Sequence, residues 1–384
     1  MISFPTLSES HESYRNKIRE FAESAIKPVA AKLDENGEFS VVLTKQLGEI
    51  GLFGINLPKA YGGQNLDTLS YIIAVEELAR IDGSQAATVA SHNSLGLGPI
   101  YYFGTDKQKE ELLPDLCTGE KLWAFGLTEP TAGSDSRGTK SEAILQNGKW
   151  IINGHKTFIT NSTSELSAGA TIQVITGQND GRKELSVLLV PRDTKGYTSE
   201  MIIDKMMWRA ADTGKLFFKD CSVSKSNILG NRGDGAKIML ETLDSGRLSI
   251  AAMGLGLAQG AYELAMEYAG KREQFGRTIN KFQAISFKLA DMATKIELAR
   301  NQLYTACWRK DTGKPFGKEA AMAKLYCSEI AKEIADEALQ VHGAYGLFKN
   351  STIERFYRDQ RILQIGEGTS EILRLVISRH LGIK

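Results

Sequence analysis

The most informative chemical group in the sequence is Glu367, which lies between two glycines in the segment QIGEGTSE at 364–371. Glycine on both sides lets the backbone turn freely and lets a ligand come close to the carboxylate. Thr369 and Ser370 are helix-capping residue types, Glu371 suits a first helical turn, and apolar residues at helical spacing follow. Glu367 is therefore predicted just before a helix N-terminus, where anions bind well. A carboxylate there can act as a catalytic base; the alternative is a solvated acid in a glycine-rich turn.

Three other segments carry groups that suit a flat, phosphorylated ligand. Residues 127–135 read LTEPTAGSD, a hydroxyl- and glycine-rich loop that offers N–H and hydroxyl donors to a cofactor ring or phosphate. Phe158 and Thr160 are predicted on one face of a strand, as a platform for a ring. Residues 272–277, REQFGR, end a helical pattern with two cations and an aromatic residue, which suits a pyrophosphate. Each also has an ordinary interpretation: a turn, a core aromatic residue and an exposed charged corner.

The elements that must position these groups fall into three zones. Up to about residue 120, apolar residues recur at helical spacing. The next zone has short β-branched and aromatic runs between turn signals, and Asn147-Gly148 marks a hairpin. The helical period then returns in long segments near 236–272, 283–311 and 317–343.

This order predicts an α+β fold that is mostly α. We expect an N-terminal α-helical domain at 1–121, a central antiparallel β domain, barrel or sandwich, at 122–231, and a C-terminal four-helix bundle of long helices at 232–384.

Composition and charge exclude several functions. Hydrophobic residues make up 42% of the 384 residues and charged residues 24%, which is ordinary for a globular protein. The net charge of +1 gives no attraction to nucleic acid or an acidic membrane. We expect no membrane insertion, because no apolar run is long enough, and a cytoplasmic location, because no leader pattern opens the chain. The four cysteines and five histidines lack metal-ligand spacing, so no metal is expected.

Two glycine-rich segments resemble nucleotide-binding motifs without meeting their requirements. In Gly254-Leu-Gly256-Leu-Ala-Gln-Gly260 the spacing is one residue too long, and the run lies inside a helical pattern. Helix packing at small residues is the better interpretation. Residues 230–237 lack the adjacent Gly-Lys of a phosphate loop and are interpreted as a connection. No G-x-S-x-G elbow is present, which argues against a serine hydrolase.

Taken in order, the segments resemble the acyl-CoA dehydrogenase family of flavoenzymes. The match rests on LTEPTAGSD (127–135), INGHKTFITN (152–161), LDSGR (243–247), REQFGR (272–277), FQ (282–283), QVHGAYG (340–346), ERFYRD (354–359) and GEGTSE (366–371). Eight ordered matches over most of the chain argue against chance. The family's two helical domains around a β domain also agree with the three zones.

The resemblance implies FAD-dependent α,β-dehydrogenation of a short or short-branched acyl-CoA to the trans-2-enoyl-CoA. In this family a carboxylate removes the α-proton while the β-hydride passes to flavin N5. By analogy Glu367 is that base, and its backbone N–H, with a flavin ribityl hydroxyl, holds the thioester oxygen. Such a base needs a dry pocket, because desolvation makes a carboxylate a stronger base.

The resemblance also assigns the other site residues. Expected flavin contacts are Phe125, Leu127, Thr128, Ser134, Phe158 and Thr160. Expected contacts to the pyrophosphate and adenine side, partly from a neighbouring subunit, are Arg272, Phe275, Gln283, Gln340, Val341, Gly343 and Ala344. Thr369 and Glu371 match further FAD positions, and Ser134, Asp244, Arg247, Gly366 and Gly368 match acyl-CoA contacts. Electron-transferring flavoprotein as electron acceptor and a homotetrameric assembly follow by the same analogy.

The sequence departs from the family pattern at specific positions. Gly366 stands where most short- and medium-chain members have Tyr, which predicts room for a branched or bulkier acyl group. The isovaleryl type also has glycine there but places its base in the LDxxR segment; here that position is Gly246, so Glu367 has no rival acid. Ala344 replaces a usual glycine and Phe158 a common tryptophan, and both changes should be tolerated.

Rival interpretations remain on the same scaffold and beyond it. An acyl-CoA oxidase, or another flavin oxidase or monooxygenase, would share the fold, and fast peroxide release in air would favour it. A non-catalytic helical scaffold would purify without flavin absorbance.

Overall fold

The computed structural model describes residues 7–349 and 351–383, and its elements follow the three zones of the sequence. The described part of the first zone contains α1 (Glu9–Phe21), α2 (Lys27–Asn36), α3 (Val41–Glu49), α4 (Thr68–Ala79), α5 (Gly83–Ser91), α6 (Gly98–Phe103) and α7 (Asp106–Thr118). Between α5 and α6 the chain forms a π-helical turn, His92–Leu97. This zone is helical as predicted.

The middle zone forms a twisted sheet. Its strands are β1 (Leu122–Gly126), β2 (Glu142–Gln146), β3 (Lys149–Thr160), β4 (Ser167–Asn179), β5 (Arg182–Pro191), β6 (Tyr197–Met201), β7 (Thr213–Ser224) and β8 (Ile228–Leu229). The strand order is β6-β7-β3-β2-β4-β5-β8, with β1 on β4. The predicted hairpin is confirmed: Asn147 and Gly148 join β2 to β3 with φ values of 48° and 75°, as a tight primed turn requires.

The sheet is mixed, which corrects the expectation of a purely antiparallel domain. β1 pairs in parallel with β4, and β2 makes one parallel pair with β4. Parallel neighbours need a long connection, and the chain between β1 and β4 supplies it. The chain leaves the sheet after β1 and enters it again at β2. The loop between these two strands carries the LTEPTAGSD segment.

The last zone is built on long helices. It contains α8 (Gly235–Lys271), the short strands β9 (Glu273–Gln274) and β10 (Arg277–Thr278), α9 (Gln283–Asp311), α10 (Gly317–His342), α11 (Thr352–Asp359) and α12 (Ser370–His380). The three predicted long segments agree with α8, α9 and α10 to within a residue or two.

Glycines in α8 serve helix packing, as interpreted from the sequence. A Cβ at Gly256 would collide with the Glu76 carbonyl oxygen, and one at Gly260 with the Arg80 carbonyl oxygen at the end of α4. Close contact of α4 with α8 joins the first and last zones into one hydrophobic core. The sheet has a separate core of its own.

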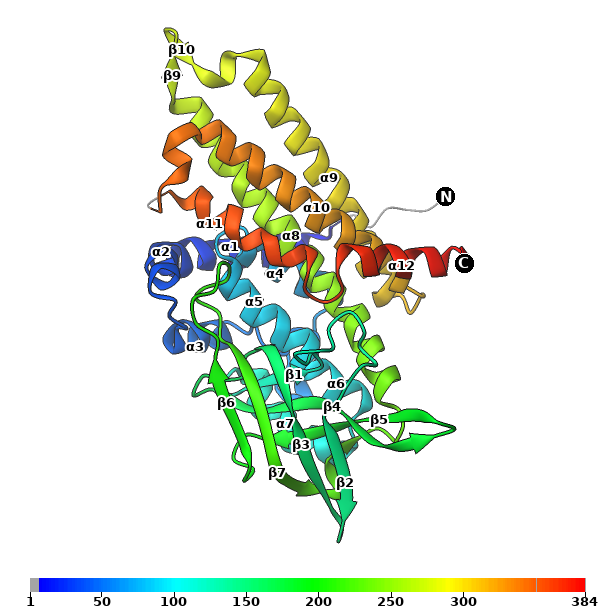
Figure 1. The fold of residues 1–384 in the computed structure, drawn as a ribbon. Coiled ribbons are helices and arrows are strands. Elements are labelled where there is room, and N and C mark those ends of the chain that lie inside the picture. The colour runs from blue at the N-terminus through cyan, green and yellow to red at the C-terminus, as the bar shows by residue number, and fades with distance from the viewer. Residues whose placement is uncertain (1–6, 350, 384) are drawn as a thin grey trace.

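Figure 1 shows the consequence for the shape of the molecule. The sheet lies at one end, the far ends of α8, α9 and α10 lie at the other, and α4 and α5 lie between them. α8 runs from beside the sheet to the β9–β10 hairpin. Over the described ranges, no helix combines the length and apolar character needed to cross a bilayer.

Candidate active site

The segment 363–370, here called the base loop, carries Glu367 immediately before α12. Thr369 caps the helix, and its hydroxyl accepts a hydrogen bond from the Ile372 N–H at 3.3 Å, which confirms the predicted helix start. Glu367 itself has φ 52°, and Gly368 has φ 100°. A left-handed conformation is unfavourable for a glutamate and concentrates at functional sites. Contacts with the rest of the fold must therefore hold the Glu367 backbone, because a glutamate does not favour this conformation by itself.

Glu367 is half-buried, and one oxygen of its carboxylate is buried against α8. Its Oε2 atom has no hydrogen-bond partner anywhere in the described chain. A Cβ at Gly246 would overlap that oxygen, and it would lie 3.0 Å from the Glu367 Cδ and 3.1 Å from Leu95 Cδ2. Glu367 therefore occupies the space that a side chain at Gly246 would take, and its Oε2 atom is buried rather than solvated.

Electrostatics favour a base that works near neutral pH. Burial disfavours the charged carboxylate and raises the pKa of Glu367 to about 7, although the positive charges of Lys324 and Arg247 favour ionisation. A general base works best when its pKa is close to the operating pH. The fold thus converts an ordinary glutamate into a group suited to proton abstraction.

Asp244 and Arg247, predicted to contact acyl-CoA, do lie together near this carboxylate. Arg247 Nη1 donates to Asp244 Oδ1 one turn away on α8. Arg247 is buried, and its Nε has no partner within the described ranges. Burial also raises the pKa of Asp244.

A group of hydroxyls near Glu367 was missed by the sequence analysis. The hydroxyls of Tyr71 and Ser94 both donate to the Ala90 carbonyl at 2.7 Å, and Ser249 Oγ lies 3.4 Å from Ser94 Oγ. Burial raises the pKa of Tyr71, and the charge of Glu367 adds to that rise. No sequence signal could identify these residues, because a hydroxyl inside a helical run looks like any other helix residue.

The predicted flavin-contact residues gather where β1 ends beside β3. The Thr157 N–H donates to the Thr128 carbonyl at 3.0 Å and so ties the loop after β1 to β3. The β3 register shifts between Lys156 and Ile159, a bulge that re-aims the intervening side chains. Phe158 has φ 61° there and is 68% exposed. An aromatic residue held in a left-handed conformation with its ring exposed suits a platform for a flat ligand.

A buried ion pair connects the two segments that form this flavin region. Lys156 Nζ donates to Glu129 Oε1 at 2.7 Å, and both side chains are almost fully buried. Glu129 also accepts from the N–H groups of Lys140 and Ser141 at 2.7 and 3.1 Å. The pair joins LTEPTAGSD to INGHKTFITN, a structural role that the sequence analysis did not assign to either residue.

The donor set fits an FAD ring system. The hydroxyls of Thr128, Ser134 and Thr160 make no hydrogen bond to any described residue, and the exposed Phe158 ring lies in the same region. Phe125 and Leu127 are half-buried and supply apolar contact. These residues could hold a polar, planar cofactor.

The π-helical turn His92–Leu97 links the flavin region to the base loop. Trp123 N–H of β1 donates to His92 Nδ1 at 3.1 Å. Three residues on, Leu95 lies against the Gly246 position and therefore beside Glu367. β1 and the base loop thus both contact this one short turn.

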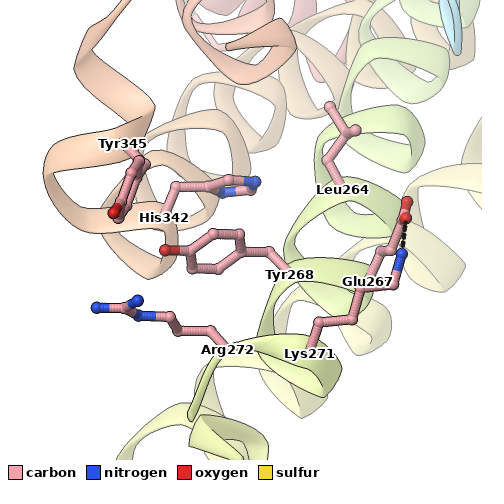
Figure 2. Close-up of a pocket in the computed structure, with 7 residues that line it drawn as sticks. All are labelled: Leu264, Glu267, Tyr268, Lys271, Arg272, His342 and Tyr345. Atoms are coloured by element: carbon pink, nitrogen blue, oxygen red, sulfur yellow. Dashed lines mark hydrogen bonds and ion pairs between the residues drawn. The ribbon is translucent and has the colours of Figure 1, made fainter. Parts of the chain in front are cut away.

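Thr369 and Glu371 lie at the start of α12, next to the base loop. The other predicted cofactor residues lie at residues 272–283 and 340–345, here called the far corner. Figure 2 shows part of it: a cavity of about 370 Å³ between α8 and the end of α10. Arg272 lies over the Tyr345 ring at 5.5 Å, and Phe275 at the hairpin tip is 93% exposed.

The far corner departs from expectation in its details. Gln283 begins α9, Gln340 lies exposed in the last turn of α10, and Gly343 and Ala344 follow the helix, both exposed. The Val341 side chain is buried in the core, so only its backbone could face a ligand. Figure 1 places this corner at the opposite end of the molecule from the sheet. One chain therefore does not bring the far corner and the flavin region together.

Known proteins match the whole described architecture. Family descriptions of the acyl-CoA dehydrogenase N-terminal, middle and C-terminal domains match residues 8–120, 124–221 and 233–382. A probable acyl-CoA dehydrogenase, YngJ, from Bacillus subtilis is 45% identical over 98% of both chains. A short-chain specific acyl-CoA dehydrogenase from Clostridium acetobutylicum is 41% identical over 97% of this chain and 98% of its own. The solved butyryl-CoA dehydrogenase from Megasphaera elsdenii superposes with a TM-score of 0.95 at 38% identity, covering 98% and 99% of the two chains.

The chain therefore belongs to the acyl-CoA dehydrogenase family. It is an FAD-dependent oxidoreductase of that class.

Proposed function

We propose that the chain converts a short or short-branched acyl-CoA to its trans-2-enoyl-CoA, with Glu367 as the base that takes the α-proton. The observation that carries this proposal is the unpartnered Glu367 carboxylate, buried next to Gly246 and with a pKa raised by burial to about 7. When bound, FAD supplies the acceptor for the β-hydride. The flavin region of β1 and β3 is the part of this chain suited to hold the ring.

The residues around Glu367 have distinct roles in this proposal. The α-proton of a thioester is weakly acidic, so its removal needs donors on the carbonyl oxygen as well as a base. The Glu367 N–H makes no hydrogen bond to any described residue, which leaves it free to donate to that oxygen. Gly368, at φ 100°, permits the turn that exposes this N–H. Leu95 and the α8 surface at Gly246 cover the Oε2 atom of the carboxylate.

We propose that Gly366 determines tolerance for the acyl group. The three atoms nearest to a Cβ at Gly366 would all belong to Ile362, at 3.6 Å or more. The position therefore has room for a side chain, and without one the same space can take a branched acyl group.

Assembly and electron transfer are proposed by family analogy and by the exposed far corner. Phe275 and Tyr345 lie exposed, and Arg272 half-buried, at the end of the molecule remote from the flavin region. A homotetramer in which this corner completes the FAD site of a neighbouring copy would explain both features. Electron-transferring flavoprotein is the proposed acceptor and the cytoplasm the proposed location. The domain boundaries at 121 and 231 stay predictions.

Glu367→Gln tests the base. The variant should bind FAD normally, as judged by flavin absorbance, and should lose at least about a thousandfold in kcat, within the range of general-base catalysis. Glu110→Gln makes the same change on the exposed side of α7 and should leave the rate unchanged. A Glu367→Gln enzyme that keeps most of its rate would remove Glu367 as the base.

Gly366→Tyr tests the pocket. We expect the rate with isobutyryl-CoA to fall relative to butyryl-CoA by about tenfold or more, because the ring fills the open space beside the branch. The ratio of the two rates serves as an internal control for general damage. An unchanged ratio would contradict the pocket argument while leaving the base assignment intact. Rapid peroxide formation in air would instead favour an oxidase.

A further inference from the structure

Helix α10 holds the base loop through polar side chains on both sides of Glu367. Lys324 Nζ donates to the Gly368 carbonyl at 2.7 Å. One turn later, Ser328 Oγ donates to the Leu363 carbonyl at 3.0 Å. The two bonds fix the backbone just after and just before the base. They leave the side chain of Glu367 without a direct partner.

Glu329 adds two contacts at the same two ends of the loop. Its carboxylate accepts from Gln364 Nε2 at 2.9 Å and from Ser370 Oγ at 2.6 Å. Two of the loop's main-chain carbonyls and two of its side chains are thus bonded to one rigid helix. Such support from a neighbouring element is what holds a catalytic group in a fixed geometry.

Lys324 differs from the other two anchors because it carries a positive charge into the interior. Its side chain is fully buried. Burial lowers its pKa to about 8, and the negative charge of Glu367 is the first influence that opposes this. A buried ammonium group is costly unless a compensating charge lies near it. One carbonyl bond does not neutralise that charge, and Glu367 is the acid whose side chain the loop leaves unpaired.

We propose that Lys324 is a positioning residue for the dehydrogenation: its ammonium group fixes the left-handed turn at Gly368 and stabilises the ionised Glu367 carboxylate across that turn. This inference rests on the proposed role of Glu367 as the base. Lys324 itself takes no proton from the substrate and transfers none to it.

The groups that face Glu367 determine the direction of the effect. Lys324 faces it from α10, Arg247 from α8 and Tyr71 from α4. Arg247 is already paired with Asp244, and Tyr71 stays neutral because burial raises its pKa. Loss of Lys324 therefore removes the positive charge that acts most strongly on Glu367. Glu367 should then ionise only at higher pH, since a nearby positive charge favours the carboxylate.

The test is the pH profile of kcat/KM for the holoenzyme with butyryl-CoA. In Lys324→Met the limb on which activity rises with pH should move upward by about one pH unit or more. Lys324→Gln can still donate to the Gly368 carbonyl but has no charge. It should show the same shift and keep a higher plateau at alkaline pH than Lys324→Met.

Two matched variants separate charge from anchoring. Ser328→Ala removes a bond to the loop without changing any charge, so its rate should fall while its limb stays at the wild-type pH. Lys332→Met makes the same chemical change on the exposed side of α10 and should leave both rate and limb unchanged. A purely structural role for Lys324 would lower the plateau without moving the limb.

The outcomes distinguish this inference from the proposed function. If kcat/KM rises at the wild-type pH in both Lys324 variants, the inference is overturned. An inactive Glu367→Gln would still support Glu367 as the base. An active Glu367→Gln overturns the base assignment itself. If Lys324→Met fails to retain FAD, Lys324→Gln decides: a shifted limb supports the role of the charge, and an unshifted limb refutes it.

Discussion

The flavin region and the base loop each bury a glutamate, and the two carboxylates have opposite environments. Glu129 has the Lys156 ammonium at 2.7 Å and two backbone N–H donors. Glu367 has an oxygen without any partner in the described chain, and its nearest cations act only at longer range. Burial would raise the pKa of Glu129, but the Lys156 charge and the hydrogen bonds outweigh it and lower that pKa. Burial prevails at Glu367 and raises its pKa to about 7.

The difference teaches that partners rather than burial decide what a buried acid does. A carboxylate with a cation and backbone donors stays ionised, is a weak base and joins two segments of backbone. An unpaired one is costly to ionise and is correspondingly basic. The same residue type is thus a structural clamp in one region and a candidate base in the other.

The largest effect is expected from Glu129→Gln. It leaves the Lys156 charge buried without a partner, which should lower the free energy of unfolding by about 3–5 kcal/mol. Chemical denaturation of the holoenzyme at pH 7 measures this, and FAD should also be lost more easily. Glu200→Gln, at an exposed ion pair with Lys215 in the same sheet, should cost less than about 1 kcal/mol.

The pH dependence of that loss has a definite sign. The pKa of Glu129 is lowered from its ordinary 4.5, so its stabilising contribution is present above about pH 4.5 and disappears as pH falls through the lower folded-state pKa. The difference between wild type and Glu129→Gln should therefore shrink as the pH falls into the acid range where Glu129 is protonated. A difference that grew toward acid would contradict the ion-pair account.

Gly246→Ala should move the Glu367 carboxylate while leaving the carboxylate group itself unchanged. The added Cβ would overlap the Glu367 carboxylate and displace it. A displacement of about 1 Å can reduce a rate about a hundredfold. Steady-state kinetics with butyryl-CoA measure the loss. Gly270→Ala, on an open stretch of the same helix, is the control and should keep full activity. An unimpaired Gly246→Ala enzyme would mean that the carboxylate can work from elsewhere.

Glu367→Gln should have the opposite effect on stability from Glu129→Gln. The pKa of Glu367 is raised from 4.5 to about 7, so its favourable contribution is present below about pH 4.5 and is lost as pH rises through 7. At pH 8 the variant should be about 1–3 kcal/mol more stable than wild type, and near pH 4 equally stable. Denaturation at both pH values measures this. A Glu367→Gln variant that is less stable than wild type at pH 8 would contradict the proposed difference between Glu129 and Glu367.

Much of the architecture was predictable because local patterns specify it. The hairpin at Asn147-Gly148, the Thr369 cap of α12 and the bounds of α8, α9 and α10 all follow from short-range preferences. The parallel pairing of β1 with β4 was not predictable, because it depends on where a strand inserts after a long connection. The bulge that turns Phe158 outward also escaped, because nothing in KTFIT indicates a register shift against β7.

The candidate site divides in the same way. Glu367, Asp244 and Arg247 were identified from their segments, and the structure brings them together. Lys324, Tyr71 and Ser94 were not, because each reaches the site from a helix whose sequence shows only ordinary periodicity. The far-corner residues were identified, yet one chain keeps them away from the flavin region.

The sequence by itself determined the family, the order of helices and strands, and the identity of the candidate base, since these depend on residue types and their spacing along the chain. Only the tertiary structure decided that Glu367 is buried without a partner while Glu129 is paired. That decision depends on which distant segments, α8 and α10 at one glutamate and β3 at the other, pack against each acid. A carboxylate's pKa and its freedom to accept a proton come from those neighbours, and neighbours in space are fixed only when the chain folds.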